Sequence, residues 1–98
     1  MADPEVSVTD NSAENRFEAH IGEDLAGVVE YELADDTITF THTRVFDAFA
    51  GKGVAGALAR TALDSVRASG ERKVVSECSF IDGWIDKHPD YQGLLAGA

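Results

Sequence analysis

Three consecutive segments of this chain alternate apolar and polar side chains, and this alternation most limits what the chain can fold into. The segments are residues 16–21, 25–33 and 37–45, and short turns rich in glycine and aspartate separate them. A two-residue period places successive side chains on opposite faces of a β-strand. Turns this short join only antiparallel neighbours. We therefore predict an antiparallel three-strand meander.

The period changes from two to about 3.6 residues after the third strand. Apolar residues recur at helical spacing over residues 54–69, which predicts an amphipathic helix that ends at Gly70. Residues 72–78 are predicted to form a short strand, and residues 80–88 a second helix. A strand–helix–strand unit usually gives a parallel pair with a right-handed crossover. The predicted fold class is α+β: an α/β mixed sheet with a meander, then helix, parallel strand and helix.

The length of 98 residues implies one domain, which we place at residues 15–98. Residues 1–14 are polar and acidic with scattered valines, and we predict that they form a flexible N-terminal tail. No stretch reaches the ~18–20 apolar residues of a membrane span, and the N-terminal segment lacks the apolar core of a signal peptide. A cytoplasmic location is therefore predicted. The single cysteine, Cys78, excludes an internal disulfide and offers no zinc-type metal cluster.

The chain carries a formal net charge of −10, from 18 acidic and 8 basic residues. This balance disfavours nucleic acid as a partner, because neutralising phosphates requires clustered lysine and arginine. It disfavours anionic membranes for the same reason. Solubility is the simplest explanation of the acidity, and attraction of a cationic substrate or a salt-adapted cytoplasm are alternatives. An anionic ligand would have to be held by a local device that outweighs the overall field.

Glycines are concentrated where the third strand gives way to the helix, at Gly51, Gly53 and Gly56. Amide N–H groups at a helix N-terminus lack intrahelical partners and carry partial positive charge, so they bind phosphate well. Glycines let phosphate oxygens approach without meeting a Cβ, and Lys52 adds a cation. The spacing is neither that of the P-loop nor that of the dinucleotide-binding fingerprint. The alternative is that Gly53 and Gly56 serve only the turn and close packing of the helix on the sheet.

Four short motifs follow the predicted elements in order: HTRV at 42–45, AGKGVA at 50–55, CSF at 78–80 and HPDY at 88–91. Together with the order of strands and helices, they resemble the GCN5-related N-acetyltransferase (GNAT) superfamily. More narrowly, they resemble its short YjdJ-like branch, the N-acetyltransferase domain-containing protein 1 proteins. The resemblance covers roughly residues 15–95. The superfamily's acyl-CoA motif, Q/R-x-x-G-x-G/A, falls on residues 50–55, where Ala50 departs from the usual glutamine or arginine.

The resemblance implies that the ligand is acetyl-CoA or coenzyme A. Its pyrophosphate would lie on the amides of residues 51–56, and its pantetheine would pair with the backbone of residues 43–46. The thioester would then approach Cys78. The residues implied to bind the ligand are Val45, Phe46, Gly51, Lys52, Gly53, Val54, Ala55, Gly56 and Ser79. Ser79 is also predicted to cap the second helix.

Two side chains are candidates for the chemistry of acetyl transfer. His42 is predicted to lie on the same strand face as Ile38 and Phe40, and a histidine can accept a proton near neutral pH; the alternative is a histidine packed on the sheet surface. Cys78 precedes a predicted helix N-terminus, which favours a reactive thiol. It could relay protons, line the acetyl pocket or become acetylated, or it could be an inert core residue. Tyr91 is an alternative acid, although anchoring the C-terminal segment is its simpler role.

The favoured hypothesis is an N-acetyltransferase-like protein that transfers an acetyl group from acetyl-CoA to an unidentified amine, such as a peptide or protein lysine. The chain is too short for the additional N-terminal elements that build the acceptor site in larger members of the superfamily. One alternative is therefore a non-catalytic module that binds acyl-CoA or another protein. A second is a small structural domain with no nucleotide ligand. Exposed strand edges permit a weak homodimer, and the chain is otherwise expected to be a monomer.

Overall fold

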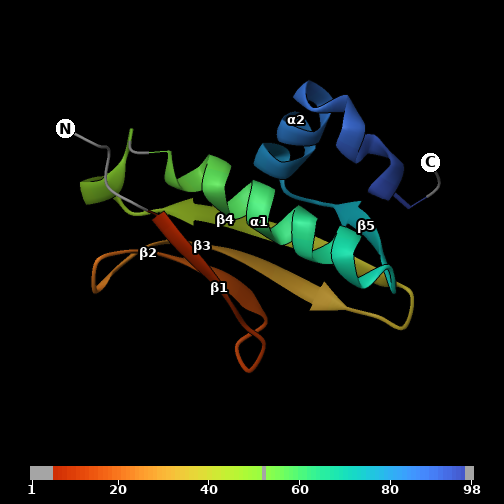
Figure 1. Ribbon diagram of the computed structural model, residues 1–98, viewed down its shortest axis with the longest axis horizontal. Helices are drawn as coiled ribbons and strands as arrows, with labels where there is room; N and C mark the ends of the chain where they lie inside the picture. The colour runs from red at the N-terminus through yellow and green to blue at the C-terminus, as the bar shows by residue number, and fades with distance from the viewer. Residues whose placement is uncertain (1–5, 52, 97–98) are drawn as a thin grey trace.

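The structure is a computed structural model that describes residues 6–51 and 53–96. One mixed sheet contains five strands in chain order, of which β1 to β4 are antiparallel neighbours and β5 runs parallel to β4 (Figure 1). The strands are β1 (Val6–Asn11), β2 (Arg16–Ile21), β3 (Asp24–Leu33), β4 (Thr37–Val45) and β5 (Lys73–Ser76). The helices are α1 (Val54–Ser69) and α2 (Ser79–Lys87), with short 3-10 helices η1 (Asp47–Phe49) and η2 (Pro89–Leu94). The predicted fold class and the predicted order of helix, parallel strand and helix are confirmed.

The sheet begins earlier than predicted, because β1 pairs with β2 along its whole length. The prediction of a flexible tail over residues 1–14 is therefore wrong for residues 6–11, while residues 1–5 lie outside the described part. Val6 and Val8 pack against the core as half-buried side chains. These scattered valines are the apolar half of a strand whose polar half faces away from the core. The meander consequently has four antiparallel strands rather than three.

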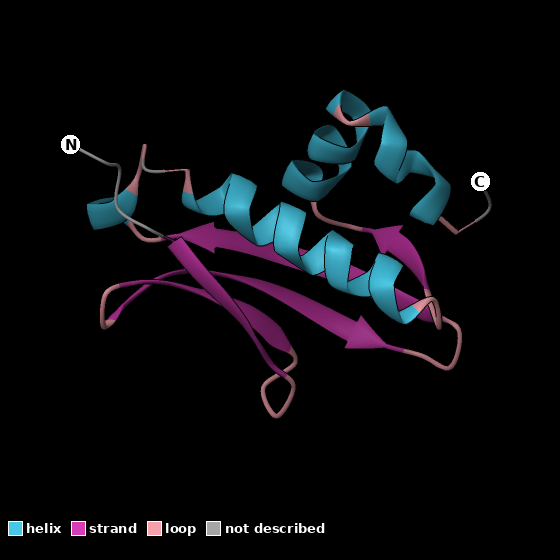
Figure 2. Cartoon of the chain, viewed as in Figure 1, coloured by secondary structure: helices cyan, strands magenta, loops and turns pink. Residues whose placement is uncertain are grey.

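Helix α1 lies across one face of the sheet, and α2 packs beside it (Figure 2). The apolar stripe of α1 is buried against the strands, with Leu58 and Leu63 completely inaccessible to solvent. Gly70 ends the helix in a left-handed conformation at φ 64°, as predicted. The opposite face of the sheet carries charged side chains from β2, β3 and β4, and no helix of the described residues covers it; we call it the uncovered face. Within the described residues, neither α-helix combines the length and apolarity that crossing a membrane requires.

Tyr31 on β3 links the core to β1 and should make stability sensitive to alkaline pH. Its ring is 4% exposed, and its hydroxyl donates to Asp10 Oδ1 at 2.6 Å. Burial, followed by this bond, raises the pKa of Tyr31 to about 12. Because folding favours the neutral phenol, its contribution is complete below pH 10 and is lost as the pH rises from 10 to about 12.

We expect Tyr31→Phe to cost about 1 kcal/mol at neutral pH, from loss of the hydrogen bond. Above pH 10 the stability of the variant should approach that of the wild type, because the phenolic contribution is then disappearing in the wild type alone. Denaturant unfolding of both proteins across this range measures the difference. A hydrogen bond to Asp64 also raises the pKa of Tyr91, in the wild type and in the variant alike. The difference in stability between the two proteins cancels this shared effect and isolates Tyr31. A gap that stays constant with pH would contradict this account.

Candidate functional site

Strands β4 and β5 separate halfway along β4. Their pairing runs from Thr37 opposite Lys73 to Phe40 opposite Ser76, and the Glu77 N–H donates a last bond to the Phe40 carbonyl at 2.9 Å. β4 then continues to residue 45 with no strand of the described chain on that side. We call residues 41–45 the open edge. The geometry is a parallel pair that splays, and it leaves backbone groups available at the carboxyl end of β4.

The hydrogen-bond pattern identifies which backbone groups the open edge offers. The Phe46 N–H donates to the Ala26 carbonyl of β3 at 3.0 Å. Residues of an antiparallel strand alternate between bonding their partner and pointing away from it. The N–H and C=O groups of Thr43 and Val45 therefore point toward the open edge. The N–H of Phe46 is already used, so a ligand at the open edge can pair with the backbone of Thr43 and Val45 but not with this N–H.

Thr43 and Cys78 meet where the two strands separate. The Thr43 hydroxyl lies 3.1 Å from the Cys78 sulfur, within hydrogen-bonding distance, although 35 positions separate them in sequence. Cys78 is 7% exposed and belongs to the hydrophobic core. It is also the N-cap of α2, so Ser79 is the first helical residue and not the cap that the sequence predicted. The thiol thus lies between the open edge and a helix N-terminus.

We call residues 50–56 the glycine loop; its last three residues, 54–56, are the first turn of α1. Gly51 and Gly53 have φ angles of 79° and 77°, a left-handed conformation that other residues rarely adopt. Gly53 is the N-cap, and among the described residues no side chain caps the helix. Within the part of the chain that the structure describes, a Cβ built on Gly53 or Gly56 meets no neighbouring heavy atom within 4 Å. Packing against the sheet therefore explains neither glycine, and Gly56 is required neither by packing nor by its backbone angles.

The other predicted ligand-binding residues of this segment have distinct positions. Val54 is 2% exposed, so its side chain belongs to the core and is not available to a ligand. Ala55 is half-buried in the first turn of α1, and Ser79 is exposed in the first turn of α2. Lys52 lies outside the described residues, and its predicted role stays a prediction.

A different glycine, Gly27 on β3, sets how closely α1 approaches the sheet. A Cβ at this position would lie 2.8 Å from the Arg44 carbonyl oxygen and 2.9 Å from Val54 Cγ1. We expect Gly27→Ala to cost about 1–3 kcal/mol, because the backbone of β4 or the first turn of α1 must shift. Chemical denaturation measures the loss, which should appear in the midpoint with an unchanged slope.

Gly83, in the middle of α2, is the matched control for Gly27. A Cβ there meets nothing within 4 Å. Gly83→Ala should therefore stabilise the protein by roughly 0.5–1 kcal/mol, through helix propensity alone. If both alanine variants changed stability in the same direction, the close contact at Gly27 would not be the cause.

A β-bulge reverses the predicted orientation of His42. Tyr31 pairs with Phe40 whereas Glu30 pairs with His42, so Thr41 is an extra residue on β4. Phe40 is completely buried, while the side chain of His42 is 78% exposed on the uncovered face. The prediction that His42 shares the Phe40 face is therefore wrong. His42 and Cys78 lie on opposite faces of β4.

On the uncovered face, His42 lies beside Glu30, with 3.6 Å between Nδ1 and Oε1. These two side chains line a pocket of about 330 Å³ together with Val28, Thr43 and Arg44. The Arg44 guanidinium lies 5.4 Å from the centre of the Phe46 ring. No local sequence pattern distinguishes Glu30 or the Thr43 hydroxyl, since each acquires its position from pairing with a distant segment.

Tyr91 is occupied elsewhere in the molecule. Its hydroxyl donates to Asp64 Oδ1 at 2.7 Å, and the Arg67 guanidinium lies 4.1 Å from its ring centre. The ring is buried and also contacts Trp84 edge-on. These contacts tie η2 to the second half of α1, which is the anchoring role rather than that of an acid at the open edge.

Comparison with known proteins agrees with the fold. Residues 16–94 match a protein-family model described as GCN5-related N-acetyl-transferase. The fold is similar to that of a GCN5-like protein from Staphylococcus aureus, with a TM-score of 0.68, 27% identity, and coverage of 100% of this chain and 93% of the other. It is also similar to a ribosomal-protein-alanine N-acetyltransferase from Brucella melitensis, with a TM-score of 0.55, 22% identity, and coverage of 85% of this chain and 62% of the other. No curated protein matches the chain significantly.

Proposed function

Because the chain belongs to the GCN5-related N-acetyltransferase family, we propose that it transfers the acetyl group of acetyl-CoA to a cationic amine that approaches from the uncovered face of the sheet. The family makes the protein an acyltransferase enzyme. We propose that the glycine loop and the open edge bind acetyl-CoA, that His42 and Glu30 act on the amine, and that the reaction takes place in the cytoplasm. The splayed edge of β4, bridged at its base by Thr43 and Cys78, is the observation that carries it.

The first turn of α1 is proposed to bind the pyrophosphate. Its N–H groups have no intrahelical partners, and the partial positive charge of the helix end attracts an anion. Gly56 supports this assignment, because a glycine costs roughly 0.5–1 kcal/mol in a helix and no packing contact among the described residues compensates for it here. A phosphate oxygen that approaches this position closely would compensate. This local device lets a chain of net charge −10 hold a polyphosphate.

The pantetheine is proposed to run along the open edge, beyond the point where β5 ends. There it pairs with the backbone of Thr43 and Val45, as a neighbouring strand would. The thioester then lies beside Cys78. We assign the thiol to the wall of the acetyl pocket rather than to a nucleophile, because it is 7% exposed and already bonded to Thr43.

His42 is proposed to accept the proton of the amine, and Glu30 to orient the imidazole. The cationic amine first loses one proton to solvent. The neutral nitrogen then attacks the thioester carbonyl carbon, the C–S bond breaks, and the second proton of the nitrogen passes to His42. Coenzyme A leaves as a thiolate and takes a proton from water. An N–H of the open edge is the donor available to the carbonyl oxygen as negative charge develops on it.

Titration of the protein with acetyl-CoA and with coenzyme A, followed by backbone amide NMR shifts, tests the ligand site. We expect saturable shifts centred on residues 51–56, Val45 and Cys78. A ligand that binds only the folded state should also raise stability by ~2.7 kcal/mol at a hundredfold excess over its dissociation constant. Absence of shifts at millimolar ligand would overturn the proposed site.

Turnover is tested with Nα-acetyl-lysine amide and spermidine as acceptors, by measuring released thiol and the acetylated product together. Product formation in proportion to thiol supports transfer to an amine. Thiol release without either product would mean hydrolysis, and binding without thiol release would favour the non-catalytic module. Either result would reject the proposed acceptor class, while the NMR titration would still report on ligand binding.

A further inference from the structure

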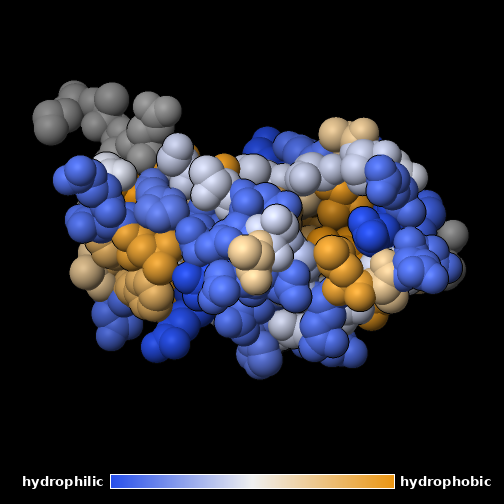
Figure 3. All heavy atoms as spheres, turned by 90° about the horizontal axis from the view of Figure 1, so that it is seen from below, coloured by the Kyte–Doolittle hydropathy of each residue, from blue (hydrophilic) through white to orange (hydrophobic). Residues whose placement is uncertain are grey.

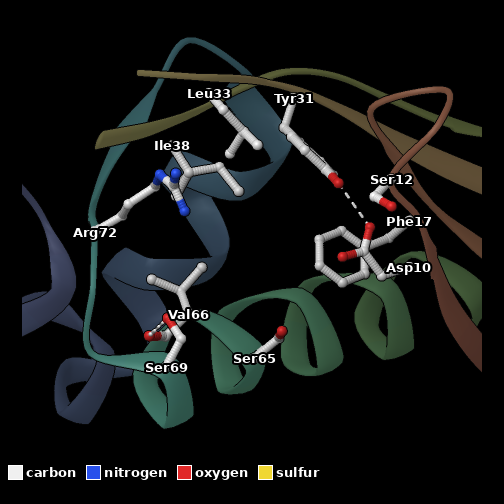
Figure 4. A pocket seen from close by; sticks show the side chains of 10 residues that line it. All are labelled: Asp10, Ser12, Phe17, Tyr31, Leu33, Ile38, Ser65, Val66, Ser69 and Arg72. Atoms are coloured by element: carbon white, nitrogen blue, oxygen red, sulfur yellow. Dashed lines mark hydrogen bonds between the residues drawn. The ribbon is translucent and has the colours of Figure 1, made fainter. Parts of the chain in front are cut away.

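A second pocket lies at the far end of α1 from the glycine loop. It has a volume of about 200 Å³ and opens between the last turns of α1 and the strands β1 to β4 (Figure 4). Phe17, Ile38 and Val66 form its apolar wall. A rise of ~1.5 Å per residue along α1 puts Ser65 and Ser69 roughly 17–22 Å from the first turn of the helix. The pocket is therefore separate from the residues proposed to bind acetyl-CoA.

One end of this pocket carries a carboxylate in a fixed position. Asp10 Oδ1 accepts the hydrogen bond of the buried Tyr31 hydroxyl at 2.6 Å. Within the described residues, no second donor bonds Asp10, which leaves Oδ2 for a ligand. In Figure 4 the carboxylate faces the interior of the pocket, above the Ser65 hydroxyl. An ammonium group is the natural partner for a carboxylate held in this way.

The other end carries a guanidinium. Arg72 Nε donates to the Ala34 carbonyl at 2.8 Å, which fixes the side chain at the rim. Its contact with Glu71 is 3.9 Å long at an exposed position, so it contributes little. Figure 4 shows Arg72 and Asp10 on opposite sides of the pocket. Ile38 and Val66 lie on the side of Arg72. A carboxylate is the ligand group that fits the free part of the guanidinium.

We propose that this Asp10–Arg72 pocket binds a small zwitterion whose ammonium and carboxylate are separated by an apolar segment, as in an ω-amino acid. The ammonium contacts Asp10, the carboxylate contacts Arg72, and the methylene chain lies against the apolar wall. The volume is sufficient, since an apolar cavity of ~150 Å³ already holds benzene. Leu33, which lines the pocket, is 49% exposed, so the site is open to solvent. Figure 3 shows hydrophobic residues at the surface between hydrophilic neighbours on this side of the molecule.

The test is an amide NMR titration of the full chain with γ-aminobutyrate. Three matched probes accompany it: butylammonium lacks the carboxylate, butyrate lacks the ammonium, and α-aminobutyrate has the same atoms with adjacent charges. We expect saturable shifts at Asp10, Tyr31 and Ser65 with γ-aminobutyrate. Each comparator should bind at least about tenfold more weakly. No saturable shift, or equal binding of all four probes, would overturn the proposal.

Two variants remove one charge each. Asp10→Asn keeps an oxygen that can accept the Tyr31 hydrogen bond, so its fold should be retained, and Arg72→Gln keeps a donor at the rim. Each should weaken γ-aminobutyrate binding by at least about tenfold, and neither should alter the shifts produced by coenzyme A. Unchanged γ-aminobutyrate affinity in either folded variant would reject recognition at both ends. Coenzyme A titration of the same samples keeps this result independent of the proposed acetyltransferase site.

Discussion

Replacing Gly56 with leucine is expected to lower the affinity for coenzyme A by at least about a hundredfold, or ~2.7 kcal/mol, in a protein that remains folded. Gly56 is a helical residue, and a Cβ there meets nothing within 4 Å outside its own helix among residues 6–51 and 53–96. Leucine is also a better helix former than glycine, so stability should rise rather than fall. The side chain would occupy the space that a phosphate needs above the first turn of α1. Isothermal titration calorimetry gives the dissociation constant, and thermal unfolding gives the stability.

Gly53→Val is a second variant of the glycine loop, and Gly93→Ala is a control outside it. Gly53→Val should also abolish binding but lower stability, because valine is strained at a φ angle of 77°. Gly93 likewise has open space at its Cβ position but lies in η2, so Gly93→Ala should bind coenzyme A normally. Wild-type affinity in a folded Gly56→Leu protein would show that the first turn of α1 is not the phosphate site.

Removing the imidazole in His42→Ala is expected to reduce kcat by roughly 10²–10⁴-fold, the usual contribution of a general base. KM for acetyl-CoA should stay unchanged, because His42 lies on the uncovered face and not beside the glycine loop. Steady-state kinetics with the acceptor that turns over measures both constants. Glu30→Gln should reduce kcat less, because it orients the base without accepting the proton.

The chain provides a matched control for His42. His20 on β2 also lies near a carboxylate, with Nε2 4.0 Å from Glu18 Oε1, two strands away from the open edge. His20→Ala should retain full activity if position, and not merely a surface histidine, matters. Cys78→Ser should retain most activity if the thiol only lines the acetyl pocket. Loss of turnover in Cys78→Ser with retention in His42→Ala would instead make the thiol the reactive group.

Local sequence predicted most of the secondary structure. The alternation in β2 and β4 and the helical period of α1 were sufficient, because each pattern is complete within a few turns of chain. β1 was missed because its two valines, Val6 and Val8, become an apolar face only when β2 lies beside them. The sequence shows that position 56 is a glycine. It does not show that the backbone there is unstrained or that a side chain would find open space.

The sequence by itself determined the mixed sheet, the glycine that ends α1 and the resemblance that led to acetyl-CoA. Each of these depends on neighbours within a few residues, where periodicity and backbone angles act. Only the tertiary structure decided which groups face one another. A single extra residue at Thr41 turned His42 away from the core, and the parting of β4 from β5 brought Thr43 to Cys78. The same is true of Tyr31 and Asp10, because strand register and helix packing set distances that no local pattern contains.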